Sequence, residues 1–486
     1  MARLYRYLDY LHQENRLRLF FIALFAGLSS FSASNSLPDL GQETAGFTSQ
    51  QEMILGKTWL RGFRRSVNEL NSPLLMDYLN EHINNLKQQT NLDPTPINHI
   101  VVNDSSLNAF AVPGHIMGIN SGLFLTAGDE TQFLSVISHE LAHLELKHFN
   151  QQINKQTDLK GLQLLTIISS IVAAQYSINI GEAILASGLA SAQTQSLSYS
   201  RSLETAADQR ANSIMANAGY PANSVYLMLN SLMRQSLNTS DAAPEYFRTH
   251  PLSQSRVADS LKLNHINSNQ IKNSSQNSLD YELILLMLTR HHGFSAANEG
   301  NNETDNFKIA KLLIDIDTLL SASHLDSAKL LIDSIPTKYK NEIAYQVRLT
   351  NYYYAKGELS EALDLVSTYL ALKPDSVRLV LLKAKLLKEN GHLPAAIQIL
   401  RERASGLQTN PWLWQKTLEY SKLSDNAWAQ LEAQLQYHWL SGEDQATVRM
   451  IENNLYSDKW SAVEKSRLKD WLQQYNEEIK LIETTF

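Results

Sequence analysis

The hydrophobic positions of the chain follow different patterns before and after a polar stretch in its middle. Up to about residue 265, helical patterns alternate with strand-like runs at Ile97–Asp104 and Ala109–Ile119. A stretch rich in Asn, Ser and Gln follows at 267–278 and is typical of a linker. Beyond it the pattern is helical throughout. The patterns predict a mixed domain at 37–265, a linker at 266–280 and a helical domain at 281–480.

The helical half repeats itself every 34 residues. Gly357 and Ala362 recur as Gly391 and Ala396, and Ala328 continues the same spacing towards the N-terminus. A glycine at the turn between two helices and a small residue where helices pack closely are typical of tetratricopeptide repeats. The spacing therefore predicts an α-solenoid of such repeats, with an ordinary helical bundle as the alternative.

Composition excludes several classes of partner and of metal site. The formal net charge of the 486 residues is −7, and no run dense in Lys or Arg occurs, which argues against a nucleic-acid partner. The sequence contains no cysteine. A disulfide, a thiol nucleophile and a cysteine ligand are thereby excluded, so any metal ion must be held by His, Asp or Glu.

The N-terminus has the three parts of a secretory signal peptide. Its basic part contains four arginines, Arg3, Arg6, Arg16 and Arg18. An apolar run at Leu19–Leu28 and small polar residues at Ser29–Ser36 follow. Ten apolar residues are too few to cross a bilayer core about 30 Å thick. We therefore predict a signal peptide at residues 1–33 and export of the mature chain, rather than a permanent membrane anchor.

The motif HELAH is the strongest candidate for chemistry. It lies within Thr131–Asn150, whose apolar positions suit a buried helix. Four residues separate His139 from His143, so a helix places both imidazoles on one face, within reach of one metal ion. Glu140 lies beside them, where it can deprotonate a metal-bound water. Two merely hydrogen-bonded histidines are the alternative. His148, about 140° further round such a helix, is expected at the surface or behind the ligands.

A third metal ligand must come from elsewhere, because a catalytic zinc ion typically has three protein ligands. The candidates lie in Ser200–Tyr220, where Glu204 and Asp208 are one helical turn apart. Glu204 can complete a His/His/Glu site. Asp208 can accept the free N–H of a ligating histidine, or hydrogen-bond to the reaction intermediate. The alternative is a solvated face on which Arg201, Asp208 and Arg210 pair.

HELAH followed by Glu-x-x-Ala-Asp resembles a zinc peptidase family. That family includes the CAAX prenyl proteases, the bacterial HtpX heat-shock peptidase and the mitochondrial inner-membrane overlapping-activity peptidase. The resemblance implies one Zn²⁺ per chain, held by His139, His143 and Glu204, with Glu140 and Asp208 as catalytic residues. The implied fold is mainly α: an α+β zincin-type metallopeptidase domain with a small sheet, followed by the α-solenoid of repeats.

Two further segments resemble landmarks of this family, Leu107–Phe124 and Thr249–Asp259. In the first, His115 stands where members of the family usually carry a second glycine. In the second, His250 matches a histidine that the resemblance implies can approach the metal and hold the enzyme latent. We therefore predict a regulatory role for His250, with a structural turn histidine as the alternative.

The architecture as a whole resembles exported, repeat-bearing members of this family. The resemblance includes an opening segment at Leu37–Gln42 and is strongest over about 37–265. It implies a periplasmic enzyme, at the inner face of the outer membrane, that hydrolyses misassembled or unfolded envelope proteins and assists outer-membrane β-barrel assembly and quality control. The implied partners of the repeats are the β-barrel assembly machinery or outer-membrane proteins. A non-proteolytic chaperone or scaffold is the alternative.

One more apolar segment, Leu162–Thr194, carries Glu182 as its only charge. Its first unbroken apolar-rich stretch, Leu162–Ala174, is too short to cross a membrane. We favour a cover over the active site, and a segment that makes peripheral contact with a membrane is the alternative.

Overall fold

The computed structural model describes residues 49–154, 199–221, 223–238, 246–266, 277–293, 304–407 and 410–485. The predicted signal peptide, the opening segment and the apolar segment Leu162–Thr194 lie outside these ranges. Among the helices in these ranges, none has the length and apolar character that a membrane crossing requires.

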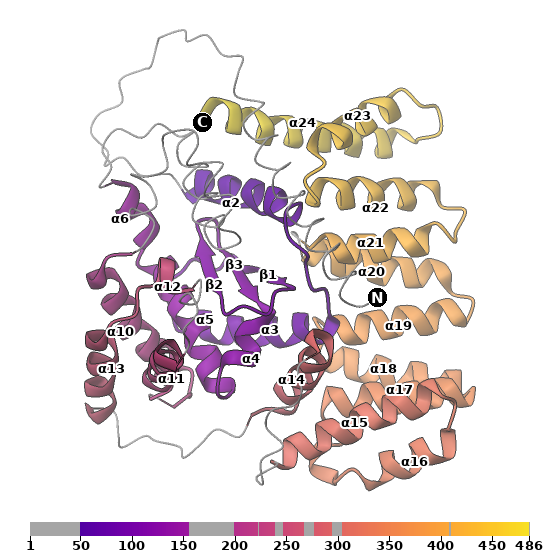
Figure 1. The fold of residues 1–486 in the computed structure, drawn as a ribbon. Coiled ribbons are helices and arrows are strands. Elements are labelled where there is room, and N and C mark those ends of the chain that lie inside the picture. Colours follow the sequence, from indigo (N-terminus) through magenta and orange to yellow (C-terminus); the bar gives the residue numbers. More distant parts are fainter. Residues whose placement is uncertain are drawn as a thin grey trace, which may run out of the picture.

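The two strand-like runs form a three-stranded sheet (Figure 1). Its strands are β1 (Asn98–Val102), β2 (Ala109–Val112) and β3 (Ile116–Asn120), in the order β1-β3-β2. β1 is parallel to β3 and β2 is antiparallel to it. β2 is therefore an edge strand.

The run Ala109–Ile119, predicted as a single strand, is a hairpin. Gly114 and His115 lie in its turn with φ of 87° and 60°, a left-handed conformation that favours glycine. The His115 ring compensates, because its Nδ1 lies 3.0 Å from the carbonyl oxygen of Thr95 and its Nε2 lies 3.2 Å from the carboxylate of Asp93. The prediction of one strand is wrong because this turn reverses the chain.

The central helix of the N-terminal region is α5 (Glu130–Glu145). Asp129 caps it by accepting a hydrogen bond from the backbone N–H of Gln132. Its apolar residues, such as Phe133 and Ile137, are buried, because the sheet and other helices cover it. The helices that pack against it are α3 (Pro73–Lys87), α4 (Ser121–Thr126), α6 (His148–Asn154), α10 (Arg201–Asn217) and α11 (Ser224–Asn238). The N-terminal region also contains α2 (Ser49–Arg64), α12 (Tyr246–Thr249) and α13 (Gln254–Ile266).

The C-terminal region is a stack of helices on one side of the molecule (Figure 1). In chain order they are α14 (Leu279–His292), α15 (Asp305–Ser321), α16 (Leu325–Ser334), the short 3₁₀ helix η3 (Thr337–Tyr339), α17 (Ile343–Lys356), α18 (Leu359–Leu372), α19 (Val377–Glu389), α20 (Leu393–Gly406), α21 (Pro411–Ser421), α22 (Ala427–Leu440), α23 (Asp444–Leu455) and α24 (Ala462–Thr485).

The 34-residue period corresponds to a repeated geometry. Gly357 and Gly391 have φ of 87° and 76°, and Ser323, one period earlier, has φ of 61°. These positive values end the first helix of each pair. The three period-related alanines are fully buried where the helices pack: Ala328, Ala362 and Ala396. The predicted fold class, a mainly helical chain with a small sheet followed by helical repeats, is confirmed.

In addition to the packing of α14 on α3 and α4, two of the contacts between the C-terminal helices and the N-terminal region lie at the start of α19 and at the turn before α23. Arg378, at the start of α19, lies 2.9 Å from the carboxylate of Asp77 on α3 and 2.6 Å from that of Asp280 on α14. At the other place, the turn before α23 reaches α2. There Gly442 has φ of 81°, and a Cβ atom on it would lie 2.6 Å from the carbonyl oxygen of Arg61. The second of these contacts holds α2 against the last repeats.

Candidate metal centre

Two histidines of α5 face each other across one helical turn. The Nε2 atoms of His139 and His143 lie 2.9 Å apart, and both side chains are almost fully buried. The i, i+4 spacing therefore has the predicted effect of placing both rings on one face. Two ring nitrogens this close need a proton or a cation between them.

α10 crosses α5 and brings a carboxylate to the two rings. Ser200 caps α10, and the fully buried Ala207 leaves room for the two helices to approach closely. Glu204 is itself fully buried. Its Oε1 lies 3.4 Å from His143 Nε2, and its Oε2 lies 3.5 Å from His139 Nε2.

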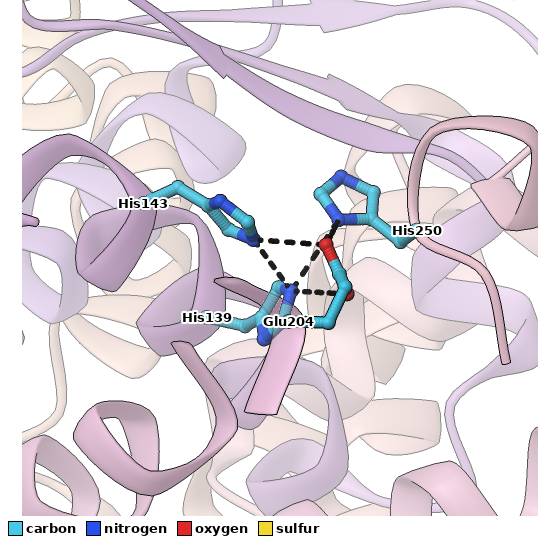
Figure 2. A group of neighbouring side chains, drawn as sticks. All are labelled: His139, His143, Glu204 and His250. Carbon is cyan, nitrogen blue, oxygen red and sulfur yellow. Dashed lines mark hydrogen bonds and ion pairs between the residues drawn. The ribbon is translucent and has the colours of Figure 1, made fainter. Parts of the chain in front are cut away.

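His250, between α12 and α13, completes the group (Figure 2). Its Nδ1 lies 3.0 Å from Glu204 Oε1 and 3.4 Å from His139 Nε2. Together with His143, these side chains offer ligand atoms that all lie within 4.8 Å of one another. A tetrahedral zinc ion with bonds of about 2.0–2.1 Å holds its ligands about 3.3 Å apart. The spacing and the chemistry of the donors therefore fit a zinc ion.

The protonation states of two members of the group, Glu204 and His143, suit a metal ion. Burial by itself raises the pKa of Glu204, but His250 and hydrogen bonds to His139 and His143 lower it well below its ordinary value. Burial and the neighbouring charge of His139 lower the pKa of His143 well below its ordinary value. An ionised carboxylate and a neutral imidazole are the forms that bind metals.

Glu140 lies beside the four potential ligands. Its Oε1 is 3.5 Å from His250 Nε2, and the hydroxyl of Tyr246 donates to the same oxygen at 3.5 Å. Burial raises the pKa of Glu140, while the charges of His250 and His139 oppose this effect. A carboxylate with a raised pKa next to a metal site is suited to accept a proton from water.

Asp208 lies behind His139. Its Oδ1 is 3.0 Å from His139 Nδ1, and it accepts two hydrogen bonds of 2.8 Å from Arg256. Burial by itself lowers the pKa of His139, but the hydrogen bonds to Asp208 and Glu204 raise it to about 10. Of the two predicted roles of Asp208, orienting a ligand fits this geometry better than contact with an intermediate, because Nδ1 faces away from the other ligands.

Arg256 was not among the predicted site residues, although it lies in the landmark segment Thr249–Asp259. Its guanidinium is 2.7 Å from Glu204 Oε2 and is buried. Glu204 and Asp208 on α10 were the signal in the sequence that a cation lies nearby, since buried carboxylates need one. Sequence patterns do not show which of the many arginines supplies it.

The surface alternative for α10 is wrong. Asp208 is buried and pairs with Arg256 rather than with its neighbours on α10. Arg210 forms an ion pair of 2.7 Å with Glu145 of α5, and Arg201 is exposed. The acidic residues of this helix therefore face the interior.

The single helix predicted over Thr131–Asn150 is interrupted. α5 ends at Glu145, Lys147 has φ of 51°, and α6 begins at His148. This left-handed residue turns the chain, so that His148 Nδ1 lies 3.0 Å from His143 Nδ1 in a buried position. Of the two positions expected for His148, the one behind a ligand is observed.

Two tyrosines that the sequence analysis did not single out cover the rings. Tyr199 stacks on His143 with ring centroids 4.3 Å apart, and its backbone N–H donates to the carbonyl of Thr249. Tyr246 stacks on His250 with centroids 4.6 Å apart. These contacts restrict both the α5 ligand and the loop that carries His250.

Comparison with known proteins decides the family. Residues 73–264, which include HELAH, Glu204, Asp208 and His250, match the model of peptidase family M48. This part of the chain is a peptidase family M48 domain. The predicted family membership is confirmed, and the protein is a metalloendopeptidase.

Several bacterial relatives of this chain carry one name. The chain is 25% identical over 463 residues to the beta-barrel assembly-enhancing protease of Yersinia pestis, covering 92% of this chain and 94% of that protein. It is 31% identical over 229 residues to the protein of that name in Escherichia coli, or 47% of each chain. It is also 29% identical over 225 residues, 46% of each chain, to a putative beta-barrel assembly-enhancing protease of Vibrio cholerae.

Proposed function

We propose that the chain is an exported zinc endopeptidase whose metal ion is held by His139, His143 and Glu204, with Glu140 as the general base. The observation that supports this most strongly is the convergence of two α5 rings and one α10 carboxylate in a buried group, with Glu140 beside it. Nitrogen and oxygen donors at tetrahedral spacing favour zinc among the divalent metals.

The residues around the metal have distinct tasks in peptide-bond hydrolysis. A zinc ion, when bound, polarises the scissile carbonyl and lowers the pKa of a water ligand. Glu140 takes the proton of that water and delivers it to the leaving amine. Asp208 accepts the Nδ1–H of His139 and thereby directs Nε2 to the metal, while Arg256 keeps Asp208 ionised.

β2 is suited to hold the substrate in an extended conformation. It is an edge strand, and the backbone of Ala111 in it hydrogen-bonds to Glu140. A substrate segment paired with β2 would therefore pass close to the general base. Only an unfolded or misassembled protein can offer such a segment, so these proteins are the proposed substrates.

The name of the relatives, beta-barrel assembly-enhancing protease, supports a role in the assembly of outer-membrane β-barrel proteins. We propose that this chain works in the periplasm, where the repeats bind the β-barrel assembly machinery or outer-membrane proteins, with peripheral contact to the membrane. The extended surface of stacked helical repeats is suited to bind proteins. No nucleic-acid partner is proposed.

His250 is proposed as a latch. Its Nδ1 is as close to Glu204 as the nitrogens of the α5 ligands are, so it occupies the position that a catalytic water needs. Release of the loop would open this position. Replacement of His250 by Ala is expected to raise the turnover of an unfolded substrate, whereas unchanged turnover would favour the structural turn histidine.

Glu140→Gln tests the proposed function directly, since it preserves the size of the side chain and removes the base. We expect the cleavage of an unfolded outer-membrane β-barrel protein to fall at least about 100-fold. Suppression of that protein's aggregation, measured in parallel, should survive if the repeats also act as a chaperone. Cleavage at the wild-type rate would contradict the peptidase mechanism and favour the scaffold alternative.

A further inference from the structure

Two cavities lie where α2 meets the last repeats. The first, of about 330 Å³, is bounded by α2, α20, α21, α22 and α24, and the second, of about 460 Å³, by the end of α2 and by α21 and α22. Figure 1 shows α2 between the sheet and this end of the repeat stack. Arg64, the last residue of α2, lines both cavities.

The guanidinium of Arg64 is only partly neutralised. Its side chain is 5% exposed, and Nε lies 3.3 Å from the carboxylate of Glu69. That contact lacks the geometry of a hydrogen bond, and neither Nε nor Nη1 has a hydrogen-bond partner within the described part of the chain. Burial lowers the pKa of Arg64, and the carboxylate of Glu69 opposes this effect. A buried donor without a partner costs about 1–3 kcal/mol, and more when it is charged.

The neighbouring Arg61 also has an Nε without a hydrogen-bond partner in the described part of the chain, but both of its Nη atoms donate hydrogen bonds, Nη1 to Glu478 and Nη2 to Asp444. Its guanidinium lies 3.0 Å from the carboxylate of Glu478 and 3.4 Å from that of Asp444, and it rests 4.1 Å from the ring centre of Trp439. Arg61 thus joins α2 to the repeats through three partners from α22, α23 and α24. Arg64 lies at the same junction, but its Nε and Nη1 atoms have no hydrogen-bond partner in the described part of the chain.

The walls of the cavities define the kind of anion that fits. Aromatic rings line them: Trp414, Trp439, Trp471 and Tyr475 in the first, and Trp412 and Tyr437 in the second. Acidic residues also line them, Glu432 and Glu478 in the first and Glu69 and Glu443 in the second. These acids oppose a multiply charged phosphate more strongly than a singly charged carboxylate. The planar guanidinium matches a carboxylate in two-point geometry.

We propose that Arg64 is the anchor of a carboxylate-binding site for a protein ligand, at the junction of the M48 domain and the repeats, with the aromatic walls receiving the apolar groups next to the carboxylate. The carboxylate can be a chain terminus or the side chain of Asp or Glu. This site is separate from the metal centre, so the proposal does not depend on the proposed function.

Peptide probes test the site in the full chain carrying Glu140→Gln, which prevents cleavage of the probe. Binding of N-acetyl-Ala-Ala-Leu with a free carboxylate is compared by calorimetry with binding of its C-terminal amide. A third probe, N-acetyl-Ala-Glu-Leu-amide, offers only a side-chain carboxylate. We expect the free acid to bind at least tenfold more tightly than the amide if a chain terminus is the ligand. If a side chain is the ligand, the third probe shows that preference instead.

Substitutions assign the binding to Arg64. In Arg64→Gln/Glu69→Gln both members of the pair become neutral, and we expect the preference for the carboxylate to fall below twofold. Arg64→Lys keeps the charge but loses the planar fork, and we expect at least fivefold weaker binding of the acid. The matched control is Arg348→Gln/Asp317→Asn, which removes an ion pair between α17 and α15 that borders neither cavity.

Two results would overturn the proposal. One is equal affinity of the wild-type site for acids and amides. The other is an unchanged preference for the carboxylate in both Arg64 variants, which would place the binding elsewhere. Thermal unfolding of each variant shows whether it is folded, and Arg64→Lys remains informative if the double variant is not.

Discussion

The metal centre and the repeat stack use opposite means to bring two helices together. Where α5 crosses α10, the contact is filled with buried ionisable groups such as His139, Glu204 and Asp208. In the repeats, the equivalent contacts are made by small alanines such as Ala362 and Ala396, which are fully buried without any polar partner.

The difference shows that the metal centre lowers the folding stability of the chain, whereas the helix contacts of the repeats raise it. Buried charges are costly unless each is compensated, whereas close apolar packing stabilises directly. The metal centre also joins residues far apart in sequence, since His139 and His250 are 111 positions apart, while the repeats rely on neighbouring helices. Substitutions at the metal centre should therefore affect catalysis and charge balance, and substitutions in the repeats should affect packing and backbone conformation.

The largest effect is expected for Glu204→Ala. A bound metal contributes several kcal/mol of transition-state stabilisation, and about 1.4 kcal/mol corresponds to tenfold in rate. We therefore expect kcat/KM for an unfolded protein to fall at least about 1,000-fold. Glu402→Ala, at an exposed position of α20, is the control and should keep full activity. A Glu204→Ala enzyme with appreciable activity would show that the third ligand lies elsewhere.

Arg256→Met should cause the largest loss of folding stability. It leaves Asp208 and Glu204 buried without their cation, which costs about 3–5 kcal/mol. The matched substitution in the repeats is Arg348→Met, whose partner Asp317 is 44% exposed. We expect a loss of about 1 kcal/mol or less there. Equal losses of free energy of unfolding, measured in urea, would contradict the contrast between the two regions.

The Asp208 carboxylate predicts sensitivity to acid. Burial by itself raises its pKa, but hydrogen bonds to Arg256 and His139 lower it below its ordinary value. The stabilisation is therefore complete above the unfolded-state pKa of about 4 and is lost as the pH falls through the folded-state pKa. Asp208→Asn should be less stable than the wild type at neutral pH, and this deficit should shrink below about pH 4. A deficit independent of pH would argue against an ionised Asp208.

Two glycine turns of the repeats test backbone conformation rather than charge. A Cβ atom at Gly357 meets nothing within 4 Å. Gly357→Ala should therefore lower the free energy of unfolding only by the cost of a left-handed backbone conformation, about 1–2 kcal/mol. At Gly442 the Cβ would also collide with the carbonyl of Arg61, which adds roughly 1–3 kcal/mol. Equal melting temperatures for the two variants would show that the turn at Gly442 can move away from α2 without loss of stability.

The sequence predicted the parts of the site that depend on local spacing. One helical turn relates His139 to His143, and another relates Glu204 to Asp208, so helix geometry was enough to pair them. The 34-residue period predicted the helical repeats, and the family resemblance implied the fold of the N-terminal domain. The family resemblance supplied the link between the two pairs, which no local pattern contains.

The remaining features arise from tertiary contacts. Arg256 is one of many arginines, and only the fold brings it to Asp208. The break at Lys147, which turns His148 towards His143, has no signal in the helical pattern. The contact of Arg61 with the last repeats joins residues more than 380 positions apart, which periodicity cannot reveal.

Metal analysis of the purified full chain tests the central claim most directly. Zinc is measured in the wild type, in His139→Ala, in Glu204→Ala and in the control Glu402→Ala. We predict one zinc ion per chain in the wild type and in the control, and its loss from both site variants. Stoichiometric zinc that persists in both His139→Ala and Glu204→Ala would contradict the proposed metal centre.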